Sequence, residues 1–312
     1  MQRVDGAGPI PAHLAGGIVA LGNFDGFHLG HQAVVGAAVA RARAEGRPAL
    51  VATFDPHPIR YFRPDAAPFR LTTLDQRERL FAAAGVDAML VFRFDPELAA
   101  LSAEDFVEQR LLAALRVGGV VTGEDFTFGQ ARSGDVNALR AWGIARGFSA
   151  DAVAPVMLDG ETISSSRIRT ALVAGQPREA ARLLTRPFTI EGVVQHGDKL
   201  GRTIGYPTAN LDMGQYLRPA YGIYAVRGRL ADGRVLNGAA NLGIRPSFNP
   251  PKELLEPYFF DFTGDLYGQG LSVELIEYLR PEAKFDSLDA LVAQMDADCA
   301  RARALLATHN PA

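Results

Sequence analysis

Strand-like and helix-like segments alternate regularly through the first half of the sequence, and this alternation then stops. Strands are predicted over residues 17–22, 49–54, 88–92, 119–122 and 152–156, and helices over 30–44, 74–84, from 102 onward, 135–146 and 166–173. Strands that alternate with helices pair in parallel through right-handed crossovers. The first half is therefore predicted to be a parallel α/β sheet with its ligand beyond the carboxyl ends of the strands.

The second half has a different pattern. Strand-like segments, several with alternating apolar and polar residues, cover 188–194, 222–230, 235–241, 256–262 and 271–279. With Gly, Pro and Asn in the connections, this pattern predicts a closed antiparallel β-barrel. Apolar residues at helical spacing over 287–306 predict a C-terminal helix packed on the barrel. We predict two domains, over 1–184 and 185–312, which agrees with roughly 150 residues per domain.

Composition excludes several classes of protein. With 48% hydrophobic and 21% charged residues, the chain is not of the disordered class. Lys plus Arg number 32 and Asp plus Glu 35, so the net charge of −3 predicts neither nucleic-acid binding nor a polybasic membrane anchor. We expect no membrane span and no signal peptide. Cys299 is the single cysteine, which excludes an internal disulfide and fits a cytoplasmic location; protein partners are not predicted.

The densest polar segment is GNFDGFHLGH, residues 22–31, between the first predicted strand and the first predicted helix. The free N–H groups of a helix start attract phosphate, and glycines let the backbone approach it. His28 and His31 are three residues apart, so both can face a phosphate from one side of the first turn. The candidate residues here are Gly22, Asn23, Asp25, His28, Gly30 and His31. A polar helix cap with solvent-facing histidines, or a zinc pair without an identified third ligand, stays open.

A second polar segment, TISSSRIR at residues 162–169, follows the last predicted strand of the first half. Hydroxyl groups and arginines at a helix start suit an oligophosphate, because the guanidinium is a rigid donor fork. Ser164, Ser165 and Arg167 are the candidates. A serine before a helix is also an ordinary N-cap, so this segment alone does not distinguish a phosphate site from a helix cap.

A third segment, HGDKLGRTIGYPTANL at residues 196–211, lies in the second half. Three glycines and two cations can form a pliable loop over phosphates: Gly197, Lys199, Gly201, Arg202 and Gly205. Thr208 and Asn210 are two residues apart, so in a strand both point the same way, and their neutral oxygens can help to hold Mg²⁺. The alternative is a Gly-rich hairpin with a proline turn.

Together, GNFDGFHLGH and ISSSRIR resemble the HxGH nucleotidyltransferase superfamily, whose domain is Rossmann-like. TFDPHP (53–58) and GEDFTFGQARSGD (123–135) narrow the resemblance to bacterial FAD synthetases, although Thr127 stands where many members have Arg. The resemblance implies that FMN and ATP give FAD and pyrophosphate. It assigns Asn23, His28, His31, Ser164 and Arg167 to the reacting phosphates. The flavin-side candidates it gives are Phe62, Asp125 and Phe128.

The second half resembles riboflavin kinase, through GRTIGYPTANL and the segments RPAYGIYAV, NGAANLGIRPSF and LEPYFFDF. The resemblance implies transfer of the γ-phosphoryl group of ATP to riboflavin, with Glu256 as base and Mg²⁺ near Thr208 and Asn210. Tyr258 departs from a histidine common in that family. The order of the two halves is that of the bifunctional riboflavin kinase/FAD synthetase. Another coenzyme-forming nucleotidyltransferase, or a flavin-storage protein without turnover, remains as a rival interpretation.

Overall fold

The computed structural model describes residues 1–6, 8–196, 205–245 and 252–308. The chain divides into two compact units. Unit 1 comprises Met1–Ala67 and Thr72–Ser164, and unit 2 comprises Pro68–Leu71 and Ser165–Ala312. The two helices after Ser164 thus group with unit 2, and the division between residues 184 and 185 stays a prediction.

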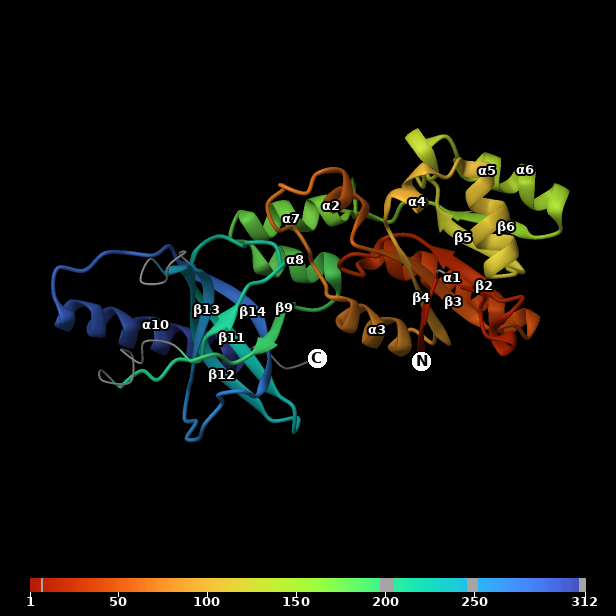
Figure 1. The fold of residues 1–312 in the computed structure, drawn as a ribbon. Helices are drawn as coiled ribbons and strands as arrows, with labels where there is room; N and C mark the ends of the chain where they lie inside the picture. Colours follow the sequence, from red (N-terminus) through yellow and green to blue (C-terminus); the bar gives the residue numbers. More distant parts are fainter. Residues whose placement is uncertain (7, 197–204, 246–251, 309–312) are drawn as a thin grey trace. The chain divides into compact units, whose positions relative to one another are not determined.

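Unit 1 is built on a six-stranded sheet (Figure 1). Its strands are β1 (Gln2–Asp5), β2 (Ile18–Leu21), β3 (Ala49–Asp55), β4 (Ala88–Arg93), β5 (Gly119–Gly123) and β6 (Ser149–Val153). They lie in the order β1-β4-β3-β2-β5-β6, and all neighbouring pairs are parallel. The predicted parallel α/β sheet is confirmed. The short, largely exposed β1 lies outside the predicted strands and pairs with β4.

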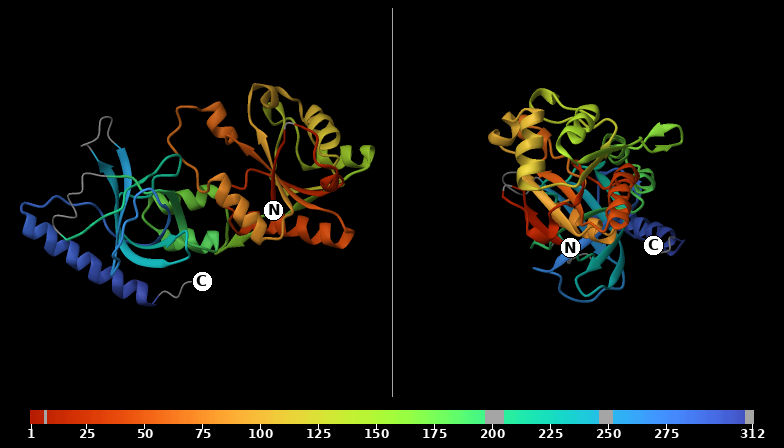
Figure 2. Two further views of the ribbon diagram at one scale, coloured as in Figure 1. Left: turned by 60° about the horizontal axis from the view of Figure 1, so that its bottom comes forward. Right: turned by 90° about the vertical axis from the view of Figure 1, so that its right-hand side faces the viewer.

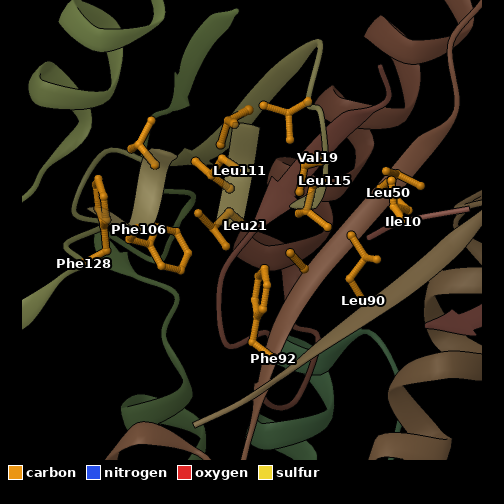
Figure 3. Close-up of a cluster of buried hydrophobic side chains, with 14 of the residues drawn as sticks. Ile10, Val19, Leu21, Leu50, Leu90, Phe92, Phe106, Leu111, Leu115 and Phe128 are labelled. Atoms are coloured by element: carbon orange, nitrogen blue, oxygen red, sulfur yellow. The ribbon is translucent and has the colours of Figure 1, made fainter. Parts of the chain in front are cut away.

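Both faces of the central strands β2, β3 and β5 are buried, which is why these strands are largely apolar. In β2, Ile18 and Ala20 belong to one hydrophobic cluster, and Val19 and Leu21 belong to the other. Helices α1 (Leu29–Glu45) and α3 (Leu74–Ala83) supply the first cluster. The second cluster, shown in Figure 3, draws on α5 (Ala103–Phe106), the π-helical η2 (Val107–Ala114) and α6 (Val136–Arg146).

Shorter elements and helix caps complete unit 1. The short elements are η1 (Ala12–Leu14), α2 (Pro58–Phe62), α4 (Pro96–Ala100), η3 (Gln130–Arg132), β7 (Met157–Leu158) and β8 (Glu161–Thr162). Thr73 and Gln76 form a capping box that fixes the start of α3. Gly46 ends α1 in the left-handed conformation that glycine adopts without strain.

The strand order reverses at β2. From β2 the chain continues to β3 and β4 on one side, and it later returns to place β5 and β6 on the other side. In open parallel sheets, ligands bind beyond the carboxyl ends of the strands at such a reversal. The loop that follows β2, residues 22–28, is therefore the place in unit 1 where the fold itself predicts a site.

Unit 2 begins with helices α7 (Ser165–Val173) and α8 (Pro177–Leu184) and continues as a six-stranded antiparallel sheet. Its strands are β9 (Phe188–Val193), β10 (Leu211–Asp212), β11 (Gly222–Leu230), β12 (Val235–Arg245), β13 (Lys252–Phe259) and β14 (Gly270–Arg280). Their order is β10-β13-β12-β11-β14-β9. A bridge between Gln195 and Asn210 joins the segments beside the two edge strands, so the sheet is a nearly closed barrel, as predicted.

A C-terminal helix, α10 (Leu288–Thr308), packs on the barrel as predicted, and Figure 2 shows it in blue along the strands. Ala302 and Leu306 of α10 share a hydrophobic cluster with Ala225 and Ala239 of the strands. The buried Asp298 of α10 also accepts hydrogen bonds from Arg280 at the end of β14, at 2.7 to 3.0 Å. Apolar packing and an ion pair thus hold the helix in place.

Pro68–Leu71 belongs to unit 2 although it lies within the sequence of unit 1. Arg70 forms a parallel bridge with Tyr216, supported by backbone hydrogen bonds to Gln215 (3.1 Å) and from Leu217 (2.8 Å). Phe69 accepts a hydrogen bond from Arg169 of α7 at 2.8 Å. These four residues, the strap, are part of the folded structure of unit 2.

Candidate active sites

The loop after β2 is held in a strained backbone conformation. Phe24 and Phe27 have φ angles of 49° and 42°, in the left-handed region that residues with a side chain seldom adopt. Both rings are buried, and they meet the ring of Phe81 edge-on, at centroid distances of 5.9 and 5.1 Å. Burial of the two rings offsets the backbone strain. Strain of this kind concentrates at binding and catalytic sites.

Asp25 fastens the same loop to the segment before α3. Its carboxylate accepts hydrogen bonds from the backbone N–H of Thr72 (2.9 Å) and from the Thr72 hydroxyl (3.2 Å). The Thr72 hydroxyl accepts in turn from the N–H of Gly26 at 2.9 Å. Asp25, predicted to lie beside phosphate, is thus placed where it shapes the loop, and its predicted contact with ATP stays a prediction.

Asn23 is held through its backbone carbonyl. This oxygen accepts hydrogen bonds from the Thr53 hydroxyl of β3 and from the Arg77 guanidinium of α3, both at 2.9 Å. Arg77 also donates to the Thr53 hydroxyl at 2.9 Å. The side-chain oxygen of Asn23 is buried and has no hydrogen-bond partner among the residues that the structure describes. A buried amide oxygen in that state is costly unless a ligand supplies the partner.

The two histidines lie together at the start of α1. His28 is the N-cap, and its Nδ1 accepts from the backbone N–H of His31 at 3.4 Å. The two rings stack with their centroids 3.6 Å apart and their planes at 21°. His28 is only 4% exposed, so it is not the solvent-facing cap that one interpretation of the sequence allowed.

The segment that contains Ser164 approaches the same helix start. A Cβ atom on Gly30 would lie 3.5 Å from the carbonyl oxygen of Ile163, an ordinary van der Waals distance, so the backbone before Ser164 passes directly beside the start of α1. Ser164 is the last residue of unit 1, and Ser165 opens α7 in unit 2. Arg167 pairs with Glu179 of α8 at 2.8 Å within unit 2.

The three flavin-side candidates differ in exposure. Phe62 ends α2 and is 65% exposed, with its ring edge-on to Tyr61 and Phe94. Phe128 is buried in the core beside Phe106, at a centroid distance of 5.6 Å (Figure 3). Asp125 is exposed in the loop after β5. Phe62 therefore has a ring available for stacking, whereas the Phe128 ring serves packing as placed.

The barrel contains a second polar group, formed by residues of neighbouring segments. Asn241 of β12 is directly opposite Glu256 of β13. On the other side of β13, Leu211 is opposite Leu255, and the N–H of Ala209 bonds to the carbonyl of Pro257 at 2.9 Å. This register places Asn210 opposite Glu256, so Asn210, Glu256 and Asn241 form one row, called below the polar row. Directly opposed residues share a face of the sheet.

Each member of the polar row is at least partly buried. Glu256 forms an ion pair with Arg245, and its side chain is 16% exposed. The side-chain oxygen of Asn241 is buried and has no hydrogen-bond partner within the described part of the chain, while its amide nitrogen donates to Glu282 at 3.1 Å. Asn210 is 7% exposed. The row therefore offers a carboxylate between two amides at a sheltered position.

The loop before Asn210 is tied to the C-terminal helix. Tyr206 is buried, donates a hydrogen bond to Asp296 of α10, and meets the ring of Tyr258 edge-on at 5.0 Å. Burial and the Asp296 carboxylate raise the pKa of Tyr206 above its ordinary value, so the phenol stays a donor. Thr208 follows and is half-buried, and Gly205 lies in the turn before it with φ of 86°. Gly197, Lys199, Gly201 and Arg202 lie outside the described residues.

The donor chemistry around Thr208 and Asn210 fits Mg²⁺ better than zinc. Within the described ranges, no group of three or more His, Cys, Asp or Glu side chains is placed to hold a metal ion. This finding does not favour a zinc pair at His28 and His31. Mg²⁺ prefers oxygen ligands and normally keeps waters and substrate phosphates in its shell, so one or two protein oxygens suffice.

Arg77 and Asn241 belong to these sites but were not among the candidates. Arg77 has a signal in the sequence, because it lies on the apolar stripe of its helix, three residues after Leu74 and four before Phe81. An arginine at such a position is seldom buried without a partner. Asn241 has no comparable signal, because its place beside Glu256 depends on the pairing of β12 with β13.

Two protein-family models match successive parts of the chain. The FAD synthetase family model matches residues 10–167, and the riboflavin kinase family model matches residues 184–306. No helix within the described part of the chain has the length and apolar character needed to cross a membrane.

Similar proteins cover nearly the whole chain. A bifunctional riboflavin kinase/FMN adenylyltransferase of Pseudomonas fluorescens is 41% identical over 98% of both chains. The proteins of the same description from Escherichia coli K12 and Haemophilus influenzae are 39% and 40% identical, over 95% and 97% of this chain and 95% and 99% of theirs. A solved structure described as a macrolide-efflux protein from Streptococcus pneumoniae has a TM-score of 0.85 at 30% identity, covering 99% of this chain and 100% of that one.

Proposed function

The chain belongs to the family of bifunctional riboflavin kinases/FMN adenylyltransferases, and on that basis we propose how its residues carry out the two reactions. The kinase reaction converts riboflavin and ATP to FMN and ADP. The adenylyltransferase reaction joins FMN to the adenylyl group of a second ATP and releases pyrophosphate. The observation that carries the assignment is the presence of two separate polar sites, the loop after β2 and the polar row of the barrel.

In the kinase reaction, Glu256 accepts the proton of the terminal ribityl hydroxyl. The hydroxyl oxygen attacks the γ-phosphorus, and the bond from that phosphorus to the bridging oxygen of ADP breaks. Phosphoryl transfer needs positioning and charge stabilisation more than covalent help from the protein. The sheltered place of Glu256 between Asn210 and Asn241 supports this role, because the amides on both sides can orient the alcohol.

Thr208 and Asn210 would hold Mg²⁺ together with phosphate oxygens of ATP. When bound, the ion neutralises charge on the transferred phosphate. The residues fit this role, because Asn210 is buried beside Glu256 and supplies a neutral oxygen. Gly197, Lys199, Gly201, Arg202 and Gly205 are proposed to cover the phosphates of the same nucleotide.

In the adenylyltransferase reaction, a phosphate oxygen of FMN attacks the α-phosphorus of ATP and pyrophosphate leaves. The second pKa of a phosphate monoester is near 6, so the nucleophile is already mostly dianionic at pH 7 and needs no strong base. The protein's part is orientation and stabilisation of developing charge. We assign this to Asn23, His28 and His31, with Ser164 and Arg167 from the ISSSRIR segment.

Other residues of unit 1 complete the proposed site. Gly22 and Gly30 keep the backbone open to phosphate, and Asp25 shapes the loop. From unit 2, Ser165 is proposed as a further ligand of the nucleotide phosphates. Phe62 is the better stacking candidate for the flavin ring, since its exposed ring can gain about 0.5–1.5 kcal/mol from an aromatic pair beyond burial. The charge of −3 and the single cysteine support a cytoplasmic enzyme that does not act on nucleic acid.

The test is a time course with purified protein, riboflavin, ATP and Mg²⁺, with the flavins separated by chromatography. Riboflavin should fall, FMN should rise transiently, and FAD should accumulate. A parallel reaction that starts from FMN isolates the adenylyl transfer. A reaction without Mg²⁺ tests whether the metal is required. Retention of riboflavin without any product would instead identify a flavin-storage protein.

A further inference from the structure

We propose that Arg77, acting with Thr53, is a positioning residue for adenylyl transfer: it fixes the backbone of Asn23 so that the Asn23 amide meets the nucleotide. The inference rests on the role proposed above for Asn23 and extends it to two residues from other elements. Neither Arg77 nor Thr53 is proposed to touch the reacting atoms.

The geometry is a closed triangle of hydrogen bonds. Arg77 donates to the Asn23 carbonyl and to the Thr53 hydroxyl, and Thr53 donates to the same carbonyl, each at 2.9 Å. Thr53 is 0% exposed and Arg77 is 3% exposed, so water does not compete for these bonds. A carbonyl that accepts two bonds from α3 and β3 leaves Asn23 little freedom to rotate.

The cost of burying Arg77 indicates that the arrangement has a purpose beyond packing. Arg77 occupies a position on the buried stripe of α3, between Leu74 and Phe81, where an apolar residue would pack without desolvating a charge. Burying a charge costs free energy unless hydrogen bonds replace the lost water. The cation at this position is therefore explained better by its hydrogen bonds to Asn23 and Thr53 than by a contribution to the stability of the fold.

The held residue lies where the fold places a ligand. Asn23 is the second residue after β2, at the reversal of strand order, and two of the next four residues have strained φ angles. Its buried side-chain oxygen lacks a partner among the described residues. A half-turn of the amide exchanges its oxygen with its NH₂ group, so the same position can accept from or donate to a nucleotide. Because the backbone is fixed, the amide is oriented before ATP arrives.

The experiment measures adenylyl transfer from FMN and ATP in Arg77→Met, Asn23→Ala and the double variant of the full chain. Arg77→Met should lower kcat by about 10- to 100-fold with a smaller change in KM, since a misplacement of about 1 Å can cost about 10²-fold. In the Asn23→Ala background, the same change should cost less than about 2-fold, because coupled residues are not additive. Arg77→Lys keeps a donor and should recover part of kcat.

Two further variants guard against loss of folding. Thr53→Val removes one hydroxyl at nearly constant volume, leaves the charge of Arg77 in place, and should lower kcat by about 5-fold, whereas Thr53→Ser should restore it. Arg79→Met, at an exposed position of α3, is the matched control and should stay within about 2-fold of wild type. Riboflavin phosphorylation by the same preparations should not change in any of these variants.

The outcomes separate the inference from the function on which it rests. If Asn23→Ala leaves adenylyl transfer intact, the proposed role of Asn23 fails. If Asn23→Ala lowers adenylyl transfer strongly, but Arg77→Met lowers kcat by the same factor in the wild-type and Asn23→Ala backgrounds, Arg77 does not act through Asn23. A parallel fall in both activities would show a general loss of structure, and if Arg77→Met does not fold, wild-type activity in Thr53→Val would overturn the inference.

Discussion

Replacement of Glu256 by Gln tests the kinase site most directly. The change keeps the size of the side chain and removes its ability to accept a proton. Glu256 is 16% exposed and paired with Arg245, so bulk water is a poor substitute for the missing base. General-base catalysis contributes about 10²- to 10⁴-fold, which corresponds to about 2.7–5.5 kcal/mol at 1.36 kcal/mol for each factor of ten. We expect kcat for FMN formation to fall within that range.

The matched control lies on the same strand. Glu253 is three residues before Glu256, so in a strand its side chain points to the opposite face. Burial raises the pKa of Glu253, but hydrogen bonds from Tyr221 and Arg218 outweigh it and lower that pKa below its ordinary value. Glu253→Gln should therefore affect stability and leave the kinase rate within a few-fold of wild type.

The assay follows FMN formation from riboflavin and FAD formation from FMN in one preparation of each variant. Glu256→Gln should leave FAD formation from FMN within about 2-fold of wild type, because Glu256 is not among the residues assigned to that reaction. A kinase rate within a few-fold of wild type in Glu256→Gln would remove this residue as the base. If Glu253→Gln and Glu256→Gln lose kinase activity equally, the loss comes from a disturbed strand and not from removal of the Glu256 carboxylate.

Three more predictions concern other parts of the chain. Replacing His28 and His31 by Ala should abolish FAD formation and leave FMN formation intact; a folded variant that loses both activities equally would contradict the two-site scheme. Asp298→Ala leaves the Arg280 charge without its partner and should lower the free energy of unfolding by about 3–5 kcal/mol, and a change below about 1 kcal/mol in urea titration would refute the ion pair's importance. Burial raises the pKa of Cys299 to about 11, so at pH 8 its thiolate is scarce and Ellman's reagent should react slowly until urea exposes it; immediate reaction of the native protein would show the burial to be wrong.

The strands and long helices could be predicted because their apolar patterns are local. The alternation in YAVRGRL lies within β11 (Gly222–Leu230), and the buried runs of the first half became the parallel sheet. Shorter elements could not be predicted in the same way. β1 has no apolar run and exists through its pairing with β4, and the two-residue β10 (Leu211–Asp212) is too short to show a period. Helix α8 (Pro177–Leu184) was missed although its buried residues lie at helical spacing.

In the candidate sites, too, local sequence patterns could be predicted and tertiary contacts could not. Residues that are close in sequence, such as His28 and His31, were found because one helix start brings them together. Asn241 reaches its site only through strand pairing, so no local pattern marks it. Arg77 is marked by its place on the apolar stripe of α3, but its contact with Asn23 is tertiary and was missed. Phe128 illustrates the opposite case: an aromatic residue inside a flavin-side signature is placed in the core beside Phe106.

The strap at Pro68–Leu71 has a consequence for any exchange of halves between relatives. Arg70 pairs with Tyr216, and the Phe69 carbonyl accepts a hydrogen bond from Arg169. Unit 2 therefore includes four residues that are encoded within the sequence of unit 1. No single crossover in the gene can transplant that half whole. Recombinants joined near Ser164 would carry one parent's strap against the other parent's partners.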